Sequence, residues 1–206
     1  MPLKEAWNVS DHYYSQQPGS EHDRRLIETS LSGVKLSFIT DAGVFSKGGL
    51  DEGSALLIEQ FEAAPGARIA DVGCGYGPIG LYLAKRIPES AVTMLDMNER
   101  ALDLARENAA RNGITGVRVL ASDGLQAVKE EKFDAIATNP PIRAGKATVH
   151  RIFEEAHDCL EAGGALWVVI RTKQGAPSAK RKLESMFEQV DERAKNKGYR
   201  IYRAIK

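Results

Sequence analysis

The amino-acid sequence predicts one α/β fold, in which a seven-stranded, mostly parallel sheet is covered by helices on both faces and closes with an antiparallel hairpin. From Arg68 onward, short apolar runs typical of buried strands alternate with stretches of helical periodicity. This alternation indicates parallel strands joined by right-handed crossovers. The last two strand-like runs are separated only by Lys195–Gly198, a hairpin loop that requires antiparallel pairing. A length of 206 residues suits one such domain with a short extension.

The expected elements begin with a polar, turn-rich arm over residues 1–33 and a strand at Val34–Thr40. Asp51 begins a capping segment for a helix that runs to about Phe61. Further strands are expected at Arg68–Val72, Ala91–Asp96, Val117–Ala121, Phe133–Thr138, Ala165–Arg171, Gln189–Ala194 and Tyr199–Ile205. Further helices are expected at Gly77–Arg86, Asn98–Asn112, Leu125–Glu130, Ala147–Leu160 and Ser178–Phe187.

We divide the chain into two parts near residue 50. Residues 1–50 contain the arm and the first strand, and we expect them to pack on the core as a short β extension. Residues 51–206 contain the alternating strands and helices, and we expect them to form the main domain.

Composition excludes several classes of protein. The longest apolar runs, such as Ala165–Ile170, are too short to cross a bilayer, and the N-terminal sequence lacks a secretion signal. The two cysteines, Cys74 and Cys159, make no disulfide framework, and no Cys/His cluster has zinc spacing. We therefore expect a cytoplasmic protein that binds neither a membrane nor a metal.

Charge is distributed unevenly along the chain although the formal net charge is zero. The segment Arg171–Lys206 holds 11 Lys/Arg and 4 Asp/Glu, a net charge of +7, so the preceding residues carry −7. A basic C-terminal face could contact phosphates. Solvated lysines that protect an edge strand would give the same pattern.

A glycine-rich loop, IADVGCGYGPIG, spans Ile69 to Gly80 directly after the first strand of the alternating series. Ligands bind at the carboxyl ends of parallel strands, and glycines let the backbone approach them closely. The loop also fits a dinucleotide pattern, with Asp96 at the distance of a ribose contact, so a dehydrogenase is one interpretation. Asp71 argues against it, because its charge would repel a pyrophosphate and suits a ligand with cationic centres. A structural turn without a ligand is the third interpretation.

Two further carboxylates follow the next strands. Asp96 ends a strand, where it could bind both ribose hydroxyls or cap the helix that begins at Asn98. Asp123 precedes Gly124 at the end of another strand, where it could accept a hydrogen bond from an adenine amine or simply form an Asp-Gly turn.

The tetrapeptide Asn139-Pro140-Pro141-Ile142 follows the fourth strand of the series and should lie in the same crevice. The prolines hold the backbone rigid and extended. The carbonyl of Pro140 and the side-chain oxygen of Asn139 could then face one amine. Two acceptors on a planar exocyclic amine favour a pyramidal nitrogen and direct its lone pair at an incoming methyl group. Catalysis would rest mainly on positioning and would need no metal.

These motifs resemble a known family. Asp71–Gly77 together with Asn139–Ile142 resembles the amino-methylating branch of the Rossmann-like class I S-adenosylmethionine-dependent methyltransferases. Other segments narrow the resemblance to the small methyltransferase domain of 16S ribosomal RNA guanine-N2 methyltransferases, namely His12–Ser15, Gly43–Lys47, Leu50–Leu57 and Arg143–Lys146. The resemblance covers nearly the whole chain. It implies S-adenosylmethionine as cofactor, rRNA methylation as activity, and ribosomal RNA or the small ribosomal subunit as partner.

The resemblance also implies roles for individual residues. The cofactor's methionine end would lie on Asp71, Gly73, Cys74, Gly75 and Gly77, its ribose and adenine on Asp96 and Met97, and its adenine edge on Asp123 and Gly124. The residues that close over the cofactor would be Phe45, Asp51, Gly53 and Ser54. Asn139 would orient the guanine amine beside the cofactor, within the catalytic tetrapeptide of Asn139, Pro140, Pro141 and Ile142. RNA would be bound by Arg143, Lys146, Tyr13 and Tyr14.

The sequence departs from the family pattern in two ways. Many relatives carry an aromatic residue after the Asn-Pro-Pro segment that stacks on the substrate base. Here that residue is Ile142, so stacking would have to come from Tyr13, Tyr14 or Phe45. The longer ribosomal enzymes also carry a second domain in front, whereas this sequence has a short arm, so we expect RNA contacts from the catalytic domain itself.

Three alternative functions remain open at this point. A protein glutamine methyltransferase uses a similar Asn-Pro-Pro loop but needs an uncharged peptide groove, whereas the basic C-terminal segment favours RNA. A dehydrogenase is opposed by Asp71 and by Asn139-Pro140-Pro141. A non-catalytic RNA-binding module would be expected to have lost the glycine loop or Asn139.

Overall fold

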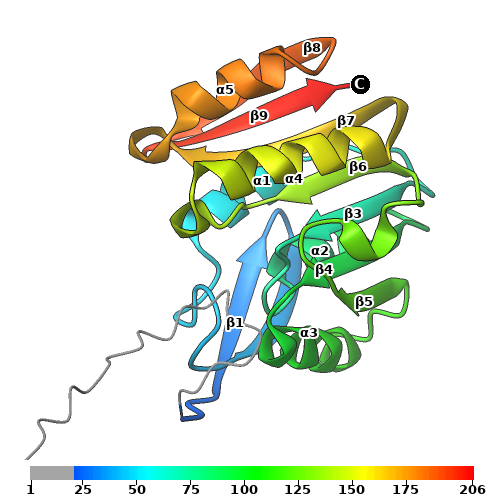
Figure 1. Ribbon diagram of the computed structural model, residues 1–206. Helices are drawn as coiled ribbons and strands as arrows, with labels where there is room; N and C mark the ends of the chain where they lie inside the picture. Colours follow the sequence, from blue (N-terminus) through cyan, green and yellow to red (C-terminus); the bar gives the residue numbers. More distant parts are fainter. Residues whose placement is uncertain (1–20) are drawn as a thin grey trace, which may run out of the picture.

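The computed structural model describes residues 21–206 and has the predicted α/β architecture (Figure 1). Its main sheet has seven strands in the order β5-β4-β3-β6-β7-β9-β8. Neighbouring strands from β5 to β7 are parallel, and β9 is antiparallel to both β7 and β8. The predicted sheet and its closing hairpin are thus confirmed. The strands are β3 (Arg68–Val72), β4 (Ala91–Asp96), β5 (Val117–Ala121), β6 (Phe133–Thr138), β7 (Leu160–Arg171), β8 (Gln189–Asn196) and β9 (Tyr199–Ile205).

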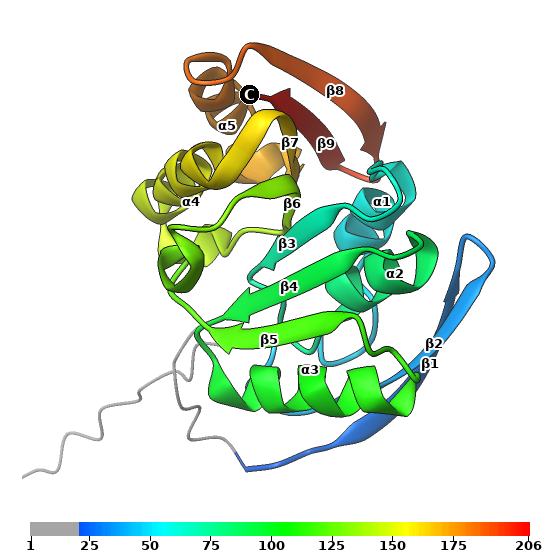
Figure 2. The same ribbon diagram turned by 90° about the vertical axis from the view of Figure 1, so that its right-hand side faces the viewer.

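Helices cover both faces of this sheet (Figure 2). One face packs with α1 (Glu52–Gln60), α2 (Pro78–Arg86) and α3 (Glu99–Arg111), and the other with α4 (Lys146–Cys159) and α5 (Ala176–Glu184). Alternate side chains of β3 point to the two faces of the sheet. Ile69 packs in the apolar cluster on the side of α1, α2 and α3, and Ala70 in the cluster on the side of α4 and α5. None of the described helices is long and apolar enough to cross a membrane.

The position of β3 locates the ligand-binding edge of the sheet. Its neighbours are β4 on one side and β6 on the other, so the strand order reverses there. In an open α/β sheet the crevice at such a switch point, outside the carboxyl ends of the strands, is where ligands bind. The glycine loop after β3 and the Asn-Pro-Pro segment after β6 both lie at this edge.

The expectation of an arm over residues 1–33 was wrong for Arg25–Leu31, which forms the strand β1. It pairs antiparallel with β2 (Val34–Thr40) in a separate two-stranded sheet. The inward face of β1 is half-buried, and Ile27 and Leu31 on alternate positions pack against the core cluster. The run is short and its other side chains are exposed or polar, so pairing with β2 completes the strand.

Two asparagines of α3 attach this hairpin to the main domain. The Asn108 side chain accepts from the Ile39 N–H at 2.7 Å and donates to the Ile39 carbonyl at 3.0 Å. One turn further, Asn112 makes the same pair of bonds to Ser37 at 2.9 and 2.7 Å. The two amides therefore satisfy backbone groups of β2 as a neighbouring strand would.

Smaller corrections concern element boundaries. β7 begins at Leu160, directly after α4, and not at Ala165, so Gly163 and Gly164 lie within an irregular stretch of strand. α5 begins at Ala176 after Gly175, whose φ is +102°, and ends at Glu184, not at Phe187. The helix expected at Leu125–Glu130 is a single 3-10 turn, and similar turns follow β6 and β7; they span Gln126–Val128, Ile142–Ala144 and Thr172–Gln174.

Candidate active site

Two adjoining pockets open at the carboxyl ends of the parallel strands. The glycine-loop pocket, named after the loop that follows β3, contains about 870 Å³ of empty space including its open mouth. The Arg171 pocket, named after the last residue of β7, contains about 920 Å³ by the same measure. Phe45, Asn139 and Pro140 line both pockets. Asn139 therefore has a pocket on each side of it.

The glycine loop forms the floor of the first pocket through its backbone. Gly73 and Gly75 have φ values of +74° and +57°, a region that other residues rarely adopt. Their own N–H groups are already used, because Gly73 donates to the Leu95 carbonyl at 2.8 Å and Gly75 to Asp96 Oδ2 at 2.8 Å. Gly77, with a φ of +96°, ends the loop and precedes Pro78 at the first turn of α2.

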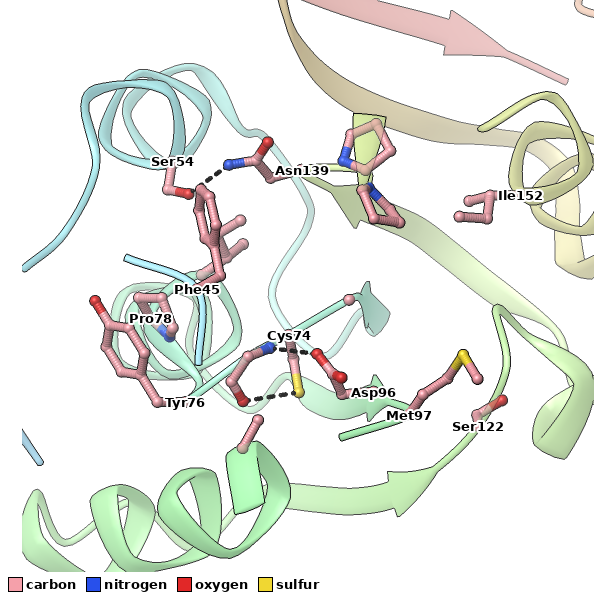
Figure 3. Close-up of a pocket in the computed structure, with 16 residues that line it drawn as sticks. Phe45, Ser54, Cys74, Tyr76, Pro78, Asp96, Met97, Ser122, Asn139 and Ile152 are labelled. Atoms are coloured by element: carbon pink, nitrogen blue, oxygen red, sulfur yellow. Dashed lines mark hydrogen bonds between the residues drawn. The ribbon is translucent and has the colours of Figure 1, made fainter. Parts of the chain in front are cut away.

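Asp96 lies in the wall of this pocket at the end of β4 (Figure 3). Its Oδ2 accepts from Gly75, and its Oδ1 accepts from the Asn98 N–H at 2.9 Å. Burial raises the pKa of the Asp96 carboxyl, while these backbone bonds lower it. The cap of α3 is the neighbouring Asn98, whose side chain accepts from Ala101. Asp96 therefore ties the loop to β4 and keeps further acceptor capacity on each oxygen.

Asp71 lies beneath the loop and is fully buried. Its Oδ2 accepts from the Gly80 N–H at 2.8 Å, whereas none of the described residues donates to Oδ1. Burial raises the pKa of this carboxyl to about 7, a bond from Gly80 opposes the rise, and the charge of Asp96 adds to it. Of the predicted residues in this motif, Asp71 and Gly77 do not line either pocket. A buried acceptor without a donor is a place where a cationic or hydrogen-bond-donating group would be favourable.

The structure brings many of the predicted residues into the glycine-loop pocket. Those that line it are Phe45, Ser54, Gly73, Cys74, Gly75, Asp96, Met97, Asn139, Pro140 and Pro141. Six other residues line it that the sequence did not predict, Tyr76, Pro78, Ile79, Ala101, Ser122 and Ile152. Tyr76, Pro78 and Ile79 stand inside the glycine motif and could have been predicted on that ground. The other three carry no motif, and only the positions of α3, the end of β5 and α4 place them there.

Asn139 lies between the two pockets and is held by α1. Its Nδ2 donates to Ser54 Oγ at 3.0 Å and lies 3.5 Å from Asp51 Oδ1 (Figure 3). The same Asp51 oxygen caps α1 by accepting from the N–H groups of Gly53 and Ser54 at 3.0 Å each. Because the amide nitrogen is engaged in this way, the orientation of Asn139 is fixed, and none of the described residues donates to its Oδ1.

The loop that follows β2 reaches over the mouth of both pockets. Asn98 donates to the Gly43 carbonyl at 2.8 Å and Arg100 to the Ala42 carbonyl at 2.9 Å, so the start of α3 anchors it. Phe45 projects from this loop and is 42% exposed, unusually high for a large apolar side chain. An aromatic ring at the shared rim could cover a ligand or stack on a planar group.

The Arg171 pocket is built from segments that are distant in sequence. Asp51, Ile142 and Arg143 were predicted site residues, and all three line it. Arg171, Gln174 and Tyr199 also line it but were not predicted. Their sequence contexts, the end of one strand, a turn and the start of another, carry no motif that would have identified them.

The remaining predicted residues lie outside both pockets. Asp123 is bound by Arg151 at 2.6 Å, so the expected contact of Asp123 with adenine stays a prediction. Arg151 also pairs with Glu155 at 2.6 Å, and Gly124 packs against that same carboxylate. Gly53 packs against the ring of Tyr199, and Lys146 lines a smaller neighbouring pocket with Ile142. Tyr13 and Tyr14 lie outside the described residues.

The basic C-terminal segment is partly neutralised. Six of its 11 cations form ion pairs with carboxylates, namely Lys180, Lys182, Arg193, Lys197, Arg200 and Arg203. Neither Arg143 nor Lys146 has an ion-pair partner within residues 21–206. Arg143 lines the Arg171 pocket and Lys146 the smaller pocket beside it, so these two cations can attract an anion there. The described residues contain no group of three or more side chains suited to hold a metal ion.

Comparison with known proteins places this geometry in context. The family model "Methyltransferase small domain" matches residues 35–203. The "Uncharacterized protein YbxB" of Bacillus subtilis (strain 168) is 48% identical over 200 residues, which cover 96% of this chain and all of that protein. The "Ribosomal RNA small subunit methyltransferase C" of Stutzerimonas stutzeri (strain A1501) is 32% identical over 206 residues. The match covers 98% of this chain and 60% of that enzyme, so this chain spans under two thirds of that relative's length.

Among solved structures, the 16S rRNA N2 G1207 methyltransferase (RsmC) of T. thermophilus, determined in complex with AdoMet and guanosine, is similar with a TM-score of 0.79. The two chains are 27% identical, and the match covers 89% of this chain and 50% of that one.

Proposed function

This chain belongs to the methyltransferase small domain family, and from that membership we propose that it transfers a methyl group from S-adenosylmethionine to the N2 amine of a guanine in 16S ribosomal RNA. The observation that carries the proposal is the setting of Asn139. It lies where two pockets meet, its Nδ2 is held by Ser54, and no described residue donates to its Oδ1. An acceptor oxygen fixed between a donor pocket and an acceptor pocket suits the orientation of an amine.

In this proposal the glycine-loop pocket holds S-adenosylmethionine, which supplies a methyl group on a positively charged sulfonium. The residues present fit such a ligand. Asp71 has a buried oxygen without a described donor, and Asp96 retains acceptor capacity at the end of β4. The small glycines of the loop leave open space where a side chain would otherwise fill the pocket.

The chemistry that this chain supplies is positioning. The Asn139 side-chain oxygen and the Pro140 carbonyl accept the two hydrogens of the guanine amine, which favours a pyramidal nitrogen and directs its lone pair toward the neighbouring pocket. The prolines keep these two acceptors in a fixed relation. The reaction is an in-line displacement, and most of its acceleration comes from holding the nitrogen in line with the methyl group.

RNA as the acceptor is supported by the relatives and by the distribution of free charge. Relatives that are 32% and 33% identical to this chain over the matched residues, which make up 60% of each relative, are named ribosomal RNA small subunit methyltransferase C. Arg143 and Lys146 lie near Asn139 without an ion-pair partner among the described residues, and we propose that they contact phosphates. We also propose that residues 1–50 extend the catalytic domain of residues 51–206, and that the protein acts on the small ribosomal subunit in the cytoplasm.

One experiment tests the substrate directly. Purified protein and tritiated S-adenosylmethionine are incubated with 30S subunits from a strain that lacks this gene, and in parallel with naked 16S RNA and with a peptide-chain release factor. We expect label in RNA, and nucleoside analysis should identify it as N2-methylguanosine. Mapping of the labelled fragment then gives the target position.

The alternative acceptor has a distinct signature in the same experiment. Label in the release factor and none in RNA would favour the protein glutamine methyltransferase and contradict the proposal. Label in RNA on a nucleoside other than guanosine would retain RNA methylation and overturn the guanine assignment.

A further inference from the structure

Arg171 is a wall residue of the pocket that adjoins Asn139, and the proposed transfer gives it no role. It ends β7 and is paired in register with Tyr199, the first residue of β9. Residues directly opposite each other in an antiparallel pair point to the same face, so the two side chains meet beside the pocket.

Tyr199 fixes the guanidinium of Arg171. The Nε of Arg171 donates to Tyr199 Oη at 2.8 Å, and its central carbon lies 4.8 Å from the centre of the Tyr199 ring. Tyr199 is itself held in place, since it is only 8% exposed and its ring packs so closely on Gly53 that a Cβ there would lie 2.6 Å away. The hydrogen bond to Tyr199 uses the Nε of Arg171 and leaves its two terminal nitrogens without a partner in residues 21–206.

The three arginines of β8 and β9 lack this freedom. Arg193 also stacks over an aromatic ring, that of Trp167 at 5.6 Å, but its guanidinium is paired with Glu62 at 2.9 Å. Arg200 and Arg203 are paired with Glu192 and Asp191. Arg171 therefore offers a fixed, unneutralised pair of N–H donors in a pocket that also contains Asn139.

We propose that Arg171 determines base specificity by donating both terminal N–H groups to the O6 and N7 atoms of the guanine whose N2 amine is held at Asn139. This inference rests on the proposed function. Guanine presents two adjacent acceptors, O6 and N7, and a bidentate arginine is their commonest partner in proteins. Adenine carries an amino donor in place of O6. Because arginine can only donate, adenine would leave a donor facing a donor.

The surroundings favour a base over a phosphate as the partner of the two terminal N–H groups of Arg171. Phe45 and Ile142 give the pocket apolar walls, which suit the faces of a planar ring. A phosphate has no apolar face that such walls could cover. Binding of a phosphate by Arg171 is nevertheless a distinct outcome of the test below.

The test compares methyl transfer to RNA that carries guanine, 2-aminopurine or 7-deazaguanine at the mapped target position. All three keep the 2-amine, but 2-aminopurine lacks O6 and 7-deazaguanine lacks N7. For the unaltered protein we expect kcat/KM to fall about tenfold for each analogue, the range of a lost arginine–guanine contact. With Arg171→Met, kcat/KM on guanine should fall to the level of the analogues, and the three substrates should become nearly equal. Arg171→Lys keeps the positive charge but lacks the pair of parallel N–H donors, so it should restore little discrimination between guanine and the analogues.

Two further variants separate specificity from structure. Tyr199→Phe removes the hydroxyl that holds Nε, so discrimination should weaken without being lost. Arg193→Met is the matched control, because Arg193 stacks on a ring and lies outside both pockets; its base preference should equal that of the unaltered protein. Cofactor affinity and thermal midpoint are measured for each variant to verify folding.

Several outcomes would overturn the inference. Equal transfer by the unaltered protein to guanine and to both analogues would do so. An Arg171→Met variant that loses the same factor on all three RNAs would assign Arg171 to a phosphate or ribose, not to the base edge. These results require methyl transfer to RNA, so they are distinct from failure of the proposed function, in which no RNA is labelled.

Discussion

The glycine-loop pocket and the Arg171 pocket meet at Asn139 but are built in different ways. The first has a floor of backbone, from two glycines with positive φ in the loop after β3, and its wall includes Asp96 at the end of β4. The second is formed by side chains from four separated segments, between Val44 and Tyr199. A site that depends on backbone geometry leaves a local motif in the sequence, whereas a site assembled from distant side chains leaves none.

The two pockets also differ in charge. The half-buried carboxylate of Asp96 lines the glycine-loop pocket, and the buried carboxylate of Asp71 lies beneath its loop, which suits a cationic ligand. Exposed cations, Arg143 and Arg171, lie at the other pocket, which suits a ligand with acceptors or phosphates. If this division reflects a methyl donor on one side and its acceptor on the other, variants on each side should change different measured quantities.

The largest effect is expected at the boundary. Asn139→Ala removes the acceptor that orients the amine, and we expect the single-turnover rate of methyl transfer to fall at least about 100-fold. Cofactor affinity, measured by isothermal titration calorimetry, should stay within about twofold, because Ser54 and the glycine loop remain. An Asn139→Ala protein that transfers methyl at the normal rate would remove Asn139 from the mechanism.

On the cofactor side, Asp71 should make stability depend on pH. Its folded pKa of about 7 exceeds the ordinary value of 3.8, so the folded state binds more protons between these values. Stability is therefore highest below pH 4 as far as this group is concerned, and it falls as pH rises to about 7. Urea unfolding of the cofactor-free protein should show roughly 2 kcal/mol more loss between pH 5 and pH 8 than that of Asp71→Asn. The same pH slope in both proteins would contradict a buried, proton-binding Asp71.

On the acceptor side, cations without partners should matter more than the paired cations of the C-terminal strands. Arg143→Ala combined with Lys146→Ala should weaken RNA binding about tenfold and lower the slope of log affinity against log salt by about 2. Lys180→Ala with Lys197→Ala removes the same charge from ion-paired positions and is the matched control. Filter binding over a salt series measures both. Equal losses in the two double variants would show that net charge, not location, governs binding.

The smallest effect tests how the boundary residue is held. Ser54→Ala removes the partner of Asn139 Nδ2, a bond worth about 1 kcal/mol, so we expect about a fivefold lower transfer rate with little change in cofactor affinity. Ser90→Ala is the control, since Ser90 is a buried serine that donates to the Ile87 carbonyl far from both pockets. A rate unchanged by Ser54→Ala would mean that Asp51 alone orients Asn139.

The sequence by itself determined the main sheet, its closing hairpin, the glycine loop and the position of Asn139. Each of these follows from local information: the period of the apolar residues, glycines that permit positive φ, and prolines that fix the backbone. The motifs that indicate the family and the cofactor also lie in short contiguous segments of the sequence.

Only the tertiary structure decided which side chains face Asn139 and which charges are free. β1 is held by pairing with β2 and by Ile27 and Leu31 against the core, and Arg171 meets Tyr199 only because β9 pairs with β7. Six of the 11 cations in the basic C-terminal segment are paired, with carboxylates as distant as Glu52 and Glu62. The physical reason is the same in each case: pairing of strands and charges acts through space, between residues whose separation along the chain leaves no periodic or local signal.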